Sequence, residues 1–206
     1  IPAGGITGLV GPDGAGKSTL LRLLAGLLIP EAGTIRVLGL DPVSEGDLLR
    51  QRLGYMPQQF GLYEDLSVLE NLTLYADLRG VLEPERTPTF ARLLAFTDLA
   101  RFTARPAGKL SGGMKQKLGL ACALLGTPDV LLLDEPGVGV DPISRRALWQ
   151  MVRELAEGGM TVLWSTAYLD EAELCDHVLL MADGEVRTSG TPATLMGAMA
   201  SRCWLL

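Results

Sequence analysis

The sequence has few cysteines, a single histidine and no long uncharged apolar run. Its three cysteines, Cys122, Cys175 and Cys203, are widely spaced among apolar or helical segments, which indicates neither a disulfide framework nor a zinc knuckle. No apolar run approaches the roughly 20 residues that a membrane-spanning helix needs, and the N-terminus has no basic-then-apolar signal pattern. We therefore expect a reducing compartment, with any membrane entered by another chain or domain.

An excess of positive charge is also missing. The chain has 18 Lys and Arg against 24 Asp and Glu, a net charge of −6 and a pI near 4.9. Because nucleic-acid binding depends on a basic surface, no nucleic-acid partner is expected. The 206 residues are 48% hydrophobic, which is enough for a buried core of roughly one to one and a half domains.

The stretch GPDGAGKST matches the phosphate-loop pattern G-x-x-x-x-G-K-[ST]. Gly14 and Gly16 allow backbone N–H groups to turn inward around phosphate oxygens, Lys17 adds a positive charge, and Ser18 offers a hydroxyl to Mg²⁺. The alternative is a glycine-rich turn that only caps a helix. The nucleotide-binding candidates are Gly11, Pro12, Asp13, Gly14, Ala15, Gly16, Lys17, Ser18 and Thr19.

Hydrophobic periodicity predicts an α/β fold in which strands alternate with helices. Strands are predicted at residues 6–10, 34–38, 53–56, 130–133, 160–164 and 177–181, and helices at 20–24, 66–78, 83–96, 111–125, 168–174 and from 142 and 192 onward. Ser67 and Glu70 predict a capping box at the start of the helix 66–78. This order of strands and helices favours a mostly parallel sheet, and with the phosphate loop it resembles the core of a P-loop NTPase (RecA-like). We expect residues 1–57 and 116–206 to form the core and residues 58–115 to form an inserted small helical subdomain.

Two further segments carry candidate chemistry. The apolar run 130–133 ends in Asp134, placed to hold Mg²⁺ through water, and Glu135, placed to orient or deprotonate an attacking water. This acid pair could instead cap the following turn. In LSGGM, Ser111 is a good helix N-cap, while Gly112 and Gly113 leave the helix start bare, which suggests a second receptor for the γ-phosphate. A simple helix cap is the alternative.

Five segments together resemble one known family. GPDGAGKST, Gln58 after YMP, LSGGMKQ, LLLDEP and Asp141 in GVGVDP occur in the order and spacing of the ATP-binding cassettes of ABC transporters. The resemblance covers nearly the whole chain. LGYMPQQFGLYEDLSVLENL, DPISRRALW and STAYLDEAE look most similar to ABC-2 type exporters, especially bacterial multidrug efflux proteins with two tandem cassettes on one polypeptide.

The resemblance implies further site roles. Gln58 resembles the glutamine that contacts Mg²⁺, takes part in catalysis and reports the nucleotide state to the membrane subunit. Residues 111–113 would close on ATP bound by the opposite cassette, and Asp141 would lie at that interface, although it could simply cap a helix. Phe60, Leu62 and Tyr63 are candidates for a groove that receives a membrane-domain helix, with core packing as the alternative.

The implied protein is an ATPase that drives export, with ATP and Mg²⁺ bound at the cytoplasmic face of the cell membrane. Its implied partners are a second ATP-binding cassette and a membrane-spanning permease subunit, which would select the transported molecule. A soluble ABC protein acting on ribosomes or DNA is one alternative; the acidic charge and the lack of room for long coiled coils argue against it. A P-loop small-molecule kinase is another, but LSGGM is not a kinase feature.

The sequence departs from the family pattern in two places. The family places a histidine where Ala167 stands, and His177 comes ten residues later at the start of the next predicted strand. Alanine cannot donate a hydrogen bond to the γ-phosphate, so we expect this site to bind ATP but to hydrolyse it slowly. No aromatic residue before Ile6 could stack on adenine, which predicts weak nucleotide affinity and suggests an excerpt from a longer polypeptide.

Overall fold

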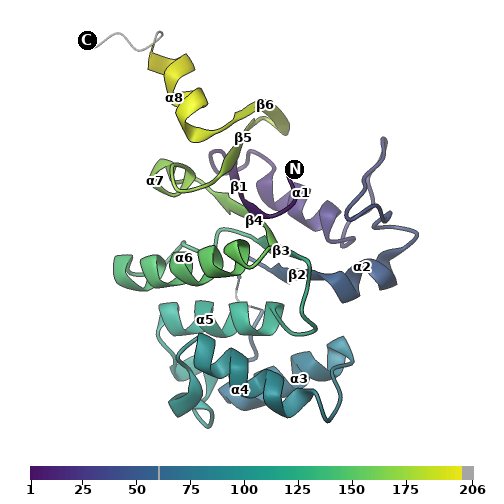
Figure 1. Ribbon diagram of the computed structural model, residues 1–206, viewed down its shortest axis with the longest axis vertical. Helices are drawn as coiled ribbons and strands as arrows, with labels where there is room; N and C mark the ends of the chain where they lie inside the picture. The colour runs from purple at the N-terminus through teal and green to yellow at the C-terminus, as the bar shows by residue number, and fades with distance from the viewer. Residues whose placement is uncertain (60, 201–206) are drawn as a thin grey trace.

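The computed structural model describes residues 1–59 and 61–200, so Phe60, Cys203 and Trp204 lie outside the described residues. Its centre is a six-stranded sheet with the order β2-β3-β4-β1-β5-β6 (Figure 1). The strands are β1 (Gly5–Val10), β2 (Leu53–Met56), β3 (Val130–Leu133), β4 (Thr161–Thr166), β5 (His177–Ala182) and β6 (Glu185–Gly190). Neighbouring strands are parallel except for β6, which pairs antiparallel with β5. The predicted mostly parallel sheet is therefore confirmed.

The central strands are buried on both faces. All four residues of β3 are buried, as are the last five of β4. Continuous apolar runs of this kind are typical of the interior of a parallel sheet. Successive side chains alternate between two cores, with Leu131 and Leu133 in one and Leu132 and Leu163 in the other.

Helices cover both faces of the sheet. The helices α1 (Lys17–Leu24) and α2 (Gly46–Arg52) lie on one side, and α5 (Gly112–Ala123) and α6 (Pro142–Glu157) lie on the other (Figure 1). The remaining helices are α3 (Val68–Arg79), α4 (Arg86–Phe96), α7 (Leu169–Ala172), α8 (Pro192–Ala200) and the short 3-10 helices Ala100–Phe102 and Ala107–Lys109. In Figure 1, α3 and α4 lie beyond α5, away from the sheet.

The start of α3 follows the local sequence. The Ser67 side chain accepts a hydrogen bond from the Glu70 N–H, and the Glu70 carboxylate accepts one from the Ser67 N–H, so the predicted capping box is present. The buried Asn71 carboxamide also donates to the carbonyls of Tyr63 and Leu66, which ties the preceding loop to this helix. The proposed division at residues 58–115 stays a prediction, and its second boundary falls inside α5.

The region between β1 and β2 differs from the prediction. Residues 34–38 were expected to form a strand, but they make only an isolated bridge between Val37 and Leu40. Leu38 and Gly39 both have positive φ, at 54° and 80°, so the chain turns back on itself there. The short helix α2 was not predicted, and α7 is shorter than expected. No helix in the described part of the chain is long and apolar enough to cross a membrane.

Candidate functional site

Four parallel strands bring the phosphate loop, Gln58 and the acid pair to one edge of the sheet. The register pairs Val10 with Thr166, Leu133 with Trp164, and Met56 with Leu133, so β1 to β4 all end at the same side. The phosphate-loop pocket lies here, with a volume of about 260 Å³. Its lining residues are Asp13, Gly14, Gly16, Lys17, Ser18, Thr19, Gln58 and Glu135. Segments far apart in the sequence thus share one cavity.

The loop between β1 and α1 has the backbone that an anion-binding nest needs. Gly14 and Gly16 adopt φ of 80° and 96°, a region that side chains disfavour. A Cβ on Gly11 would lie 2.3 Å from the Met181 carbonyl oxygen, so only glycine fits at that position. Gly16 caps α1 without a side-chain hydrogen bond, and free N–H groups at a helix start can bind an anion.

Lys17 and Glu135 are paired in the pocket. The buried Lys17 Nζ lies 3.0 Å from Glu135 Oε1 and donates hydrogen bonds to the carbonyls of Gly11 and Pro12 at 2.7 and 3.0 Å. On its other side, Glu135 Oε2 accepts a hydrogen bond of 2.9 Å from Gln58 Nε2. The predicted phosphate-binding cation, base and glutamine are therefore in direct contact.

Asp134 joins the phosphate loop to the neighbouring strands. The Ser18 hydroxyl donates to Asp134 Oδ1 at 2.8 Å, and the Ser165 hydroxyl donates to the same oxygen at 3.0 Å. Tyr55 donates to Asp134 Oδ2 at 3.4 Å, and burial raises the pKa of its phenol. Hydroxyl, carboxylate and carboxamide oxygens are the ligands that Mg²⁺ prefers, so Ser18, Asp134 and Gln58 have the right chemistry to hold it.

Ser165 is a site residue that the sequence analysis missed. Its hydroxyl, fully buried, accepts a hydrogen bond of 2.9 Å from the Glu135 N–H while donating to Asp134. From the next strand it thereby holds the backbone of Glu135 and the carboxylate of Asp134. A polar residue at the end of an apolar strand was the available signal, but the strand order that puts it beside Glu135 is not visible in the sequence.

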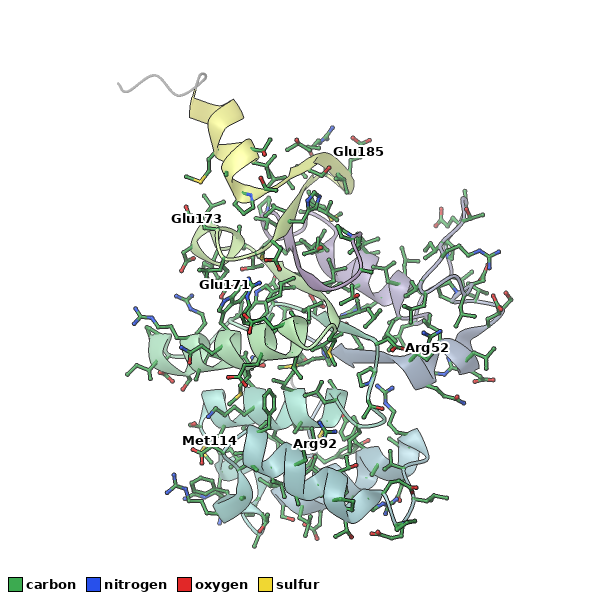
Figure 2. The ribbon with its side chains drawn as sticks, viewed as in Figure 1. Arg52, Arg92, Met114, Glu171, Glu173 and Glu185 are labelled. Atoms are coloured by element: carbon green, nitrogen blue, oxygen red, sulfur yellow. The ribbon has the colours of Figure 1, made fainter. Side chains whose placement is uncertain are left out.

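The LSGGM segment begins α5 as predicted but lies outside the phosphate-loop pocket. Ser111 is exposed and accepts a hydrogen bond from the N–H of Met114, which is labelled in Figure 2. A Cβ on Gly113 would lie 2.4 Å from the Ser144 side chain, and one on Gly112 would lie 3.2 Å from the Gly139 carbonyl. The chain's own segment before and within α6 packs against this backbone, and the role of LSGGM as a γ-phosphate receptor stays a prediction.

Asp141 caps α6. Its carboxylate accepts hydrogen bonds from the N–H groups of Ile143 and Ser144 at 3.1 and 2.9 Å. Hydrogen bonds from the Ser144 side chain and backbone lower the pKa of Asp141. The capping alternative is therefore present in the structure, and any role at an interface remains a proposal.

Ala167 follows β4 directly and is exposed beside the phosphate loop. The preceding carbonyl, that of Thr166, accepts a hydrogen bond of 3.2 Å from the Gly11 N–H. His177 begins β5 and pairs with Thr7, at the amino end of a parallel strand. Because that end is opposite the carboxyl edge, His177 cannot replace a histidine at position 167.

These features define a class of protein. A parallel α/β sheet whose first strand opens into a glycine nest with a lysine, beside a strand that ends in two acids, is a P-loop NTPase domain. The comparison with protein families then gives the family, because the family described as "ABC transporter" matches residues 1–138. The chain belongs to the ABC transporter family.

Individual relatives agree with this assignment. The chain is 66% identical over 206 residues to "Probable multidrug ABC transporter ATP-binding protein YbhF" of Escherichia coli, and 41% identical over 202 residues to "Daunorubicin/doxorubicin resistance ATP-binding protein DrrA" of Streptomyces peucetius. It spans 36% and 61% of these relatives, which align with 100% and 98% of the chain. A dimeric ATP-binding cassette in a post-hydrolysis state, bound to ADP and Pi, superimposes with a TM-score of 0.83, 28% identity and coverage of 93% of this chain and 87% of that one.

Proposed function

We propose that the chain is the ATP-binding cassette of a drug exporter and that it hydrolyses ATP to drive transport. The observation that carries the proposal is the convergence of Lys17, Gln58 and Glu135 on one pocket at the carboxyl edge of the sheet. The names of the relatives supply the substrate class, since both refer to drugs. The transported molecule would be selected by a permease.

The phosphate loop supplies binding. Backbone N–H groups in the glycine turn and at the start of α1 would surround the phosphate oxygens, and Lys17 contributes the positive charge. Oxygens of Ser18, Asp134 and Gln58 would hold Mg²⁺, which would neutralise charge on the phosphates. In this proposal the nucleotide takes the place of Glu135 as the partner of Lys17.

Glu135 acts as the general base. In the structure its two carboxylate oxygens are occupied by Lys17 and Gln58. Once phosphate oxygens engage Lys17, one oxygen of Glu135 is released and can accept a proton from water, while Gln58 keeps the carboxylate oriented. The ion pair thus keeps the base occupied until nucleotide arrives.

A second cassette completes the site. Ser111, Gly112 and Gly113 do not line the pocket within the described chain. Ser111 is exposed and therefore available to a neighbouring cassette, whereas Gly113 is buried against Ser144 of α6. Two cassettes would sandwich ATP between one phosphate loop and the other LSGGM segment, with Asp141 at the contact. The 206 residues hold one cassette, and we propose that the other is on the same polypeptide in tandem or on another chain.

The cassette is proposed to work at the cytoplasmic face of the cell membrane, bound to a membrane-spanning permease. Ala167 leaves the γ-phosphate without one donor, so hydrolysis at this site is slow while a partner cassette supplies a complete site. A role on ribosomes or DNA, or as a small-molecule kinase, finds no support in the comparisons, which give transporter proteins.

The experiment uses the full-length protein with its permease in liposomes, with Mg-ATP hydrolysis and drug efflux as readouts. Lys17→Met and Glu135→Gln are each expected to lower single-site turnover at this cassette by about 10²-fold or more, because each removes a charge from the reacting centre. Lys109→Met, a change at an exposed lysine outside the pocket, is the matched control and should have little effect. Absent hydrolysis in the wild type, or full activity in Lys17→Met, would contradict the proposal.

A further inference from the structure

Glu171 is a buried carboxylate outside the phosphate-loop pocket. It lies on α7, is 4% exposed, and is labelled in Figure 2 between α7 and α6. Its Oε2 accepts a hydrogen bond of 2.8 Å from Trp164 Nε1, but its Oε1 has no hydrogen-bond partner among the described residues. Because burial of an acceptor without a partner is costly, its presence calls for a physical reason.

Glu171 Oε1, the oxygen without a hydrogen-bond partner among the described residues, lies against the loop that follows Glu135. A Cβ on Gly137 would lie 2.3 Å from Glu171 Oε1, so the backbone at Gly137 passes directly against this carboxylate. The φ of Gly137 is not in the left-handed region, so close packing rather than backbone conformation requires glycine there. Arg145 Nε, 3.8 Å from the same oxygen, balances the charge from the side of α6.

The loop in question, residues 136–141, connects the proposed base to the start of α6. Its Val138 N–H donates a hydrogen bond of 3.2 Å to the Glu135 carbonyl, and the Val138 side chain is exposed. Glu135 adopts a φ of 49°, an uncommon value for a residue with a side chain. A backbone in this conformation persists only where its surroundings determine it.

Two side-chain contacts from the direction of β4 hold this backbone. Ser165 accepts the hydrogen bond of the Glu135 N–H, and its neighbour Trp164 holds Glu171, which packs under Gly137. Trp164 is in turn fixed by an edge-to-face contact with Trp149 of α6, with ring centroids 4.8 Å apart. The position of the loop is therefore set from β4, the strand that Ala167 follows directly.

We propose that Glu171 is a positioning residue for catalysis: its carboxylate fixes loop 136–141 from below and so sets where Glu135 points. The inference rests on the proposed function of Glu135. Glu171 does not line the phosphate-loop pocket, so it acts through Gly137 rather than on the nucleotide.

The test uses the full-length protein with its permease and measures kcat, KM and nucleotide affinity. Glu171→Ala is expected to lower kcat by roughly 10- to 10²-fold, the effect of misplacing a reacting group, with little change in nucleotide affinity. Gly137→Ala should lower kcat similarly, because its methyl group meets the carboxylate. The double variant Gly137→Ala/Glu171→Ala should recover part of the loss, since the methyl group fills the vacated space. Glu171→Gln, which keeps the shape, should stay close to the wild type.

Val152→Ala is the matched control, because it also shortens a fully buried side chain but lies in the core on α6. It should lower the melting temperature without lowering kcat. If Glu171→Ala changes the melting temperature only, or if the two single losses simply multiply in the double variant, the positioning role is wrong.

Hydrogen exchange gives a readout that does not depend on hydrolysis. In nucleotide-free protein, Glu171→Ala should speed amide exchange at residues 137–140 at least several-fold more than Val152→Ala does. Unchanged exchange there would overturn the inference even if the wild type is an active ATPase. Faster exchange in a protein with no ATPase activity would instead support the contact between Glu171 and the loop, and would contradict the proposed ATPase function.

Discussion

Lys17 and Glu135 form a buried ion pair in which Nζ and Oε1 are 3.0 Å apart and the side chains are 3% and 7% exposed. The pair joins the start of α1 to the end of β3, and each member keeps further partners, two carbonyls for Lys17 and the Gln58 carboxamide for Glu135. In the structure, the cation that the phosphate loop offers to an anion is therefore neutralised by the acid that we assign as the base.

This ion pair predicts a stability effect separate from catalysis. Lys17→Met leaves the Glu135 carboxylate buried without its cation, which should lower the free energy of unfolding by about 3 kcal/mol. Lys17→Met/Glu135→Gln should recover most of that loss, because no uncompensated charge remains. Thermal unfolding of the nucleotide-free protein measures both variants. A melting temperature of Lys17→Met equal to that of the wild type would show that the pair does not matter in solution.

The exposed Ala167, which follows β4, predicts that a histidine there increases ATP hydrolysis. Ala167→His adds a donor beside the phosphate loop and should raise hydrolysis at this site by up to about 10²-fold. The measurement is single-site turnover in protein that contains both cassettes. Ala167→Leu adds bulk without a donor and is the control, expected to stay at the wild-type rate. No change in Ala167→His would remove the proposed role of this position.

The contact between α5 and α6 predicts a packing defect. Gly113→Ala places a methyl group against the Ser144 side chain, within 2.4 Å in the unrelaxed structure, and should destabilise the fold by about 1 to 3 kcal/mol. Gly112→Ala meets only the Gly139 carbonyl at 3.2 Å and should cost less. Chemical denaturation of nucleotide-free protein compares the two. Equal losses would mean that this contact is not what requires glycine at position 113.

The cap of α6 predicts a pH dependence. Hydrogen bonds from Ser144 hold the pKa of Asp141 below its ordinary value of 3.8. A lowered folded-state pKa means that the stabilisation is fully present above pH 3.8 and is lost as the pH falls through the folded-state value. Asp141→Asn keeps a capping oxygen but does not titrate. Melting temperatures between pH 6 and pH 2 should therefore show the wild type losing its advantage over Asp141→Asn below about pH 4. A constant difference over that range would contradict this explanation.

Much of the fold could be predicted because its signals are local. The apolar run of β3, the capping box of α3 and the glycines of the phosphate loop each depend on neighbours in the sequence, and the structure has all three elements where they were expected. The strand predicted at residues 34–38 was wrong. Its alternating pattern finds no neighbouring strand, and the positive φ of Leu38 turns the chain back instead.

The sequence by itself determined which chemical groups the site can use, since Lys17, Ser18 and the acid pair follow from motif and position. Which side chains contact these groups was decided only by the tertiary structure. Ser165 beside Asp134, and Glu171 beneath Gly137, depend on β4 lying between β3 and β1 and on α7 folding back against β4. Local sequence sets the backbone of one segment at a time, whereas a contact between segments depends on strand order and register, which the packing of the whole core selects.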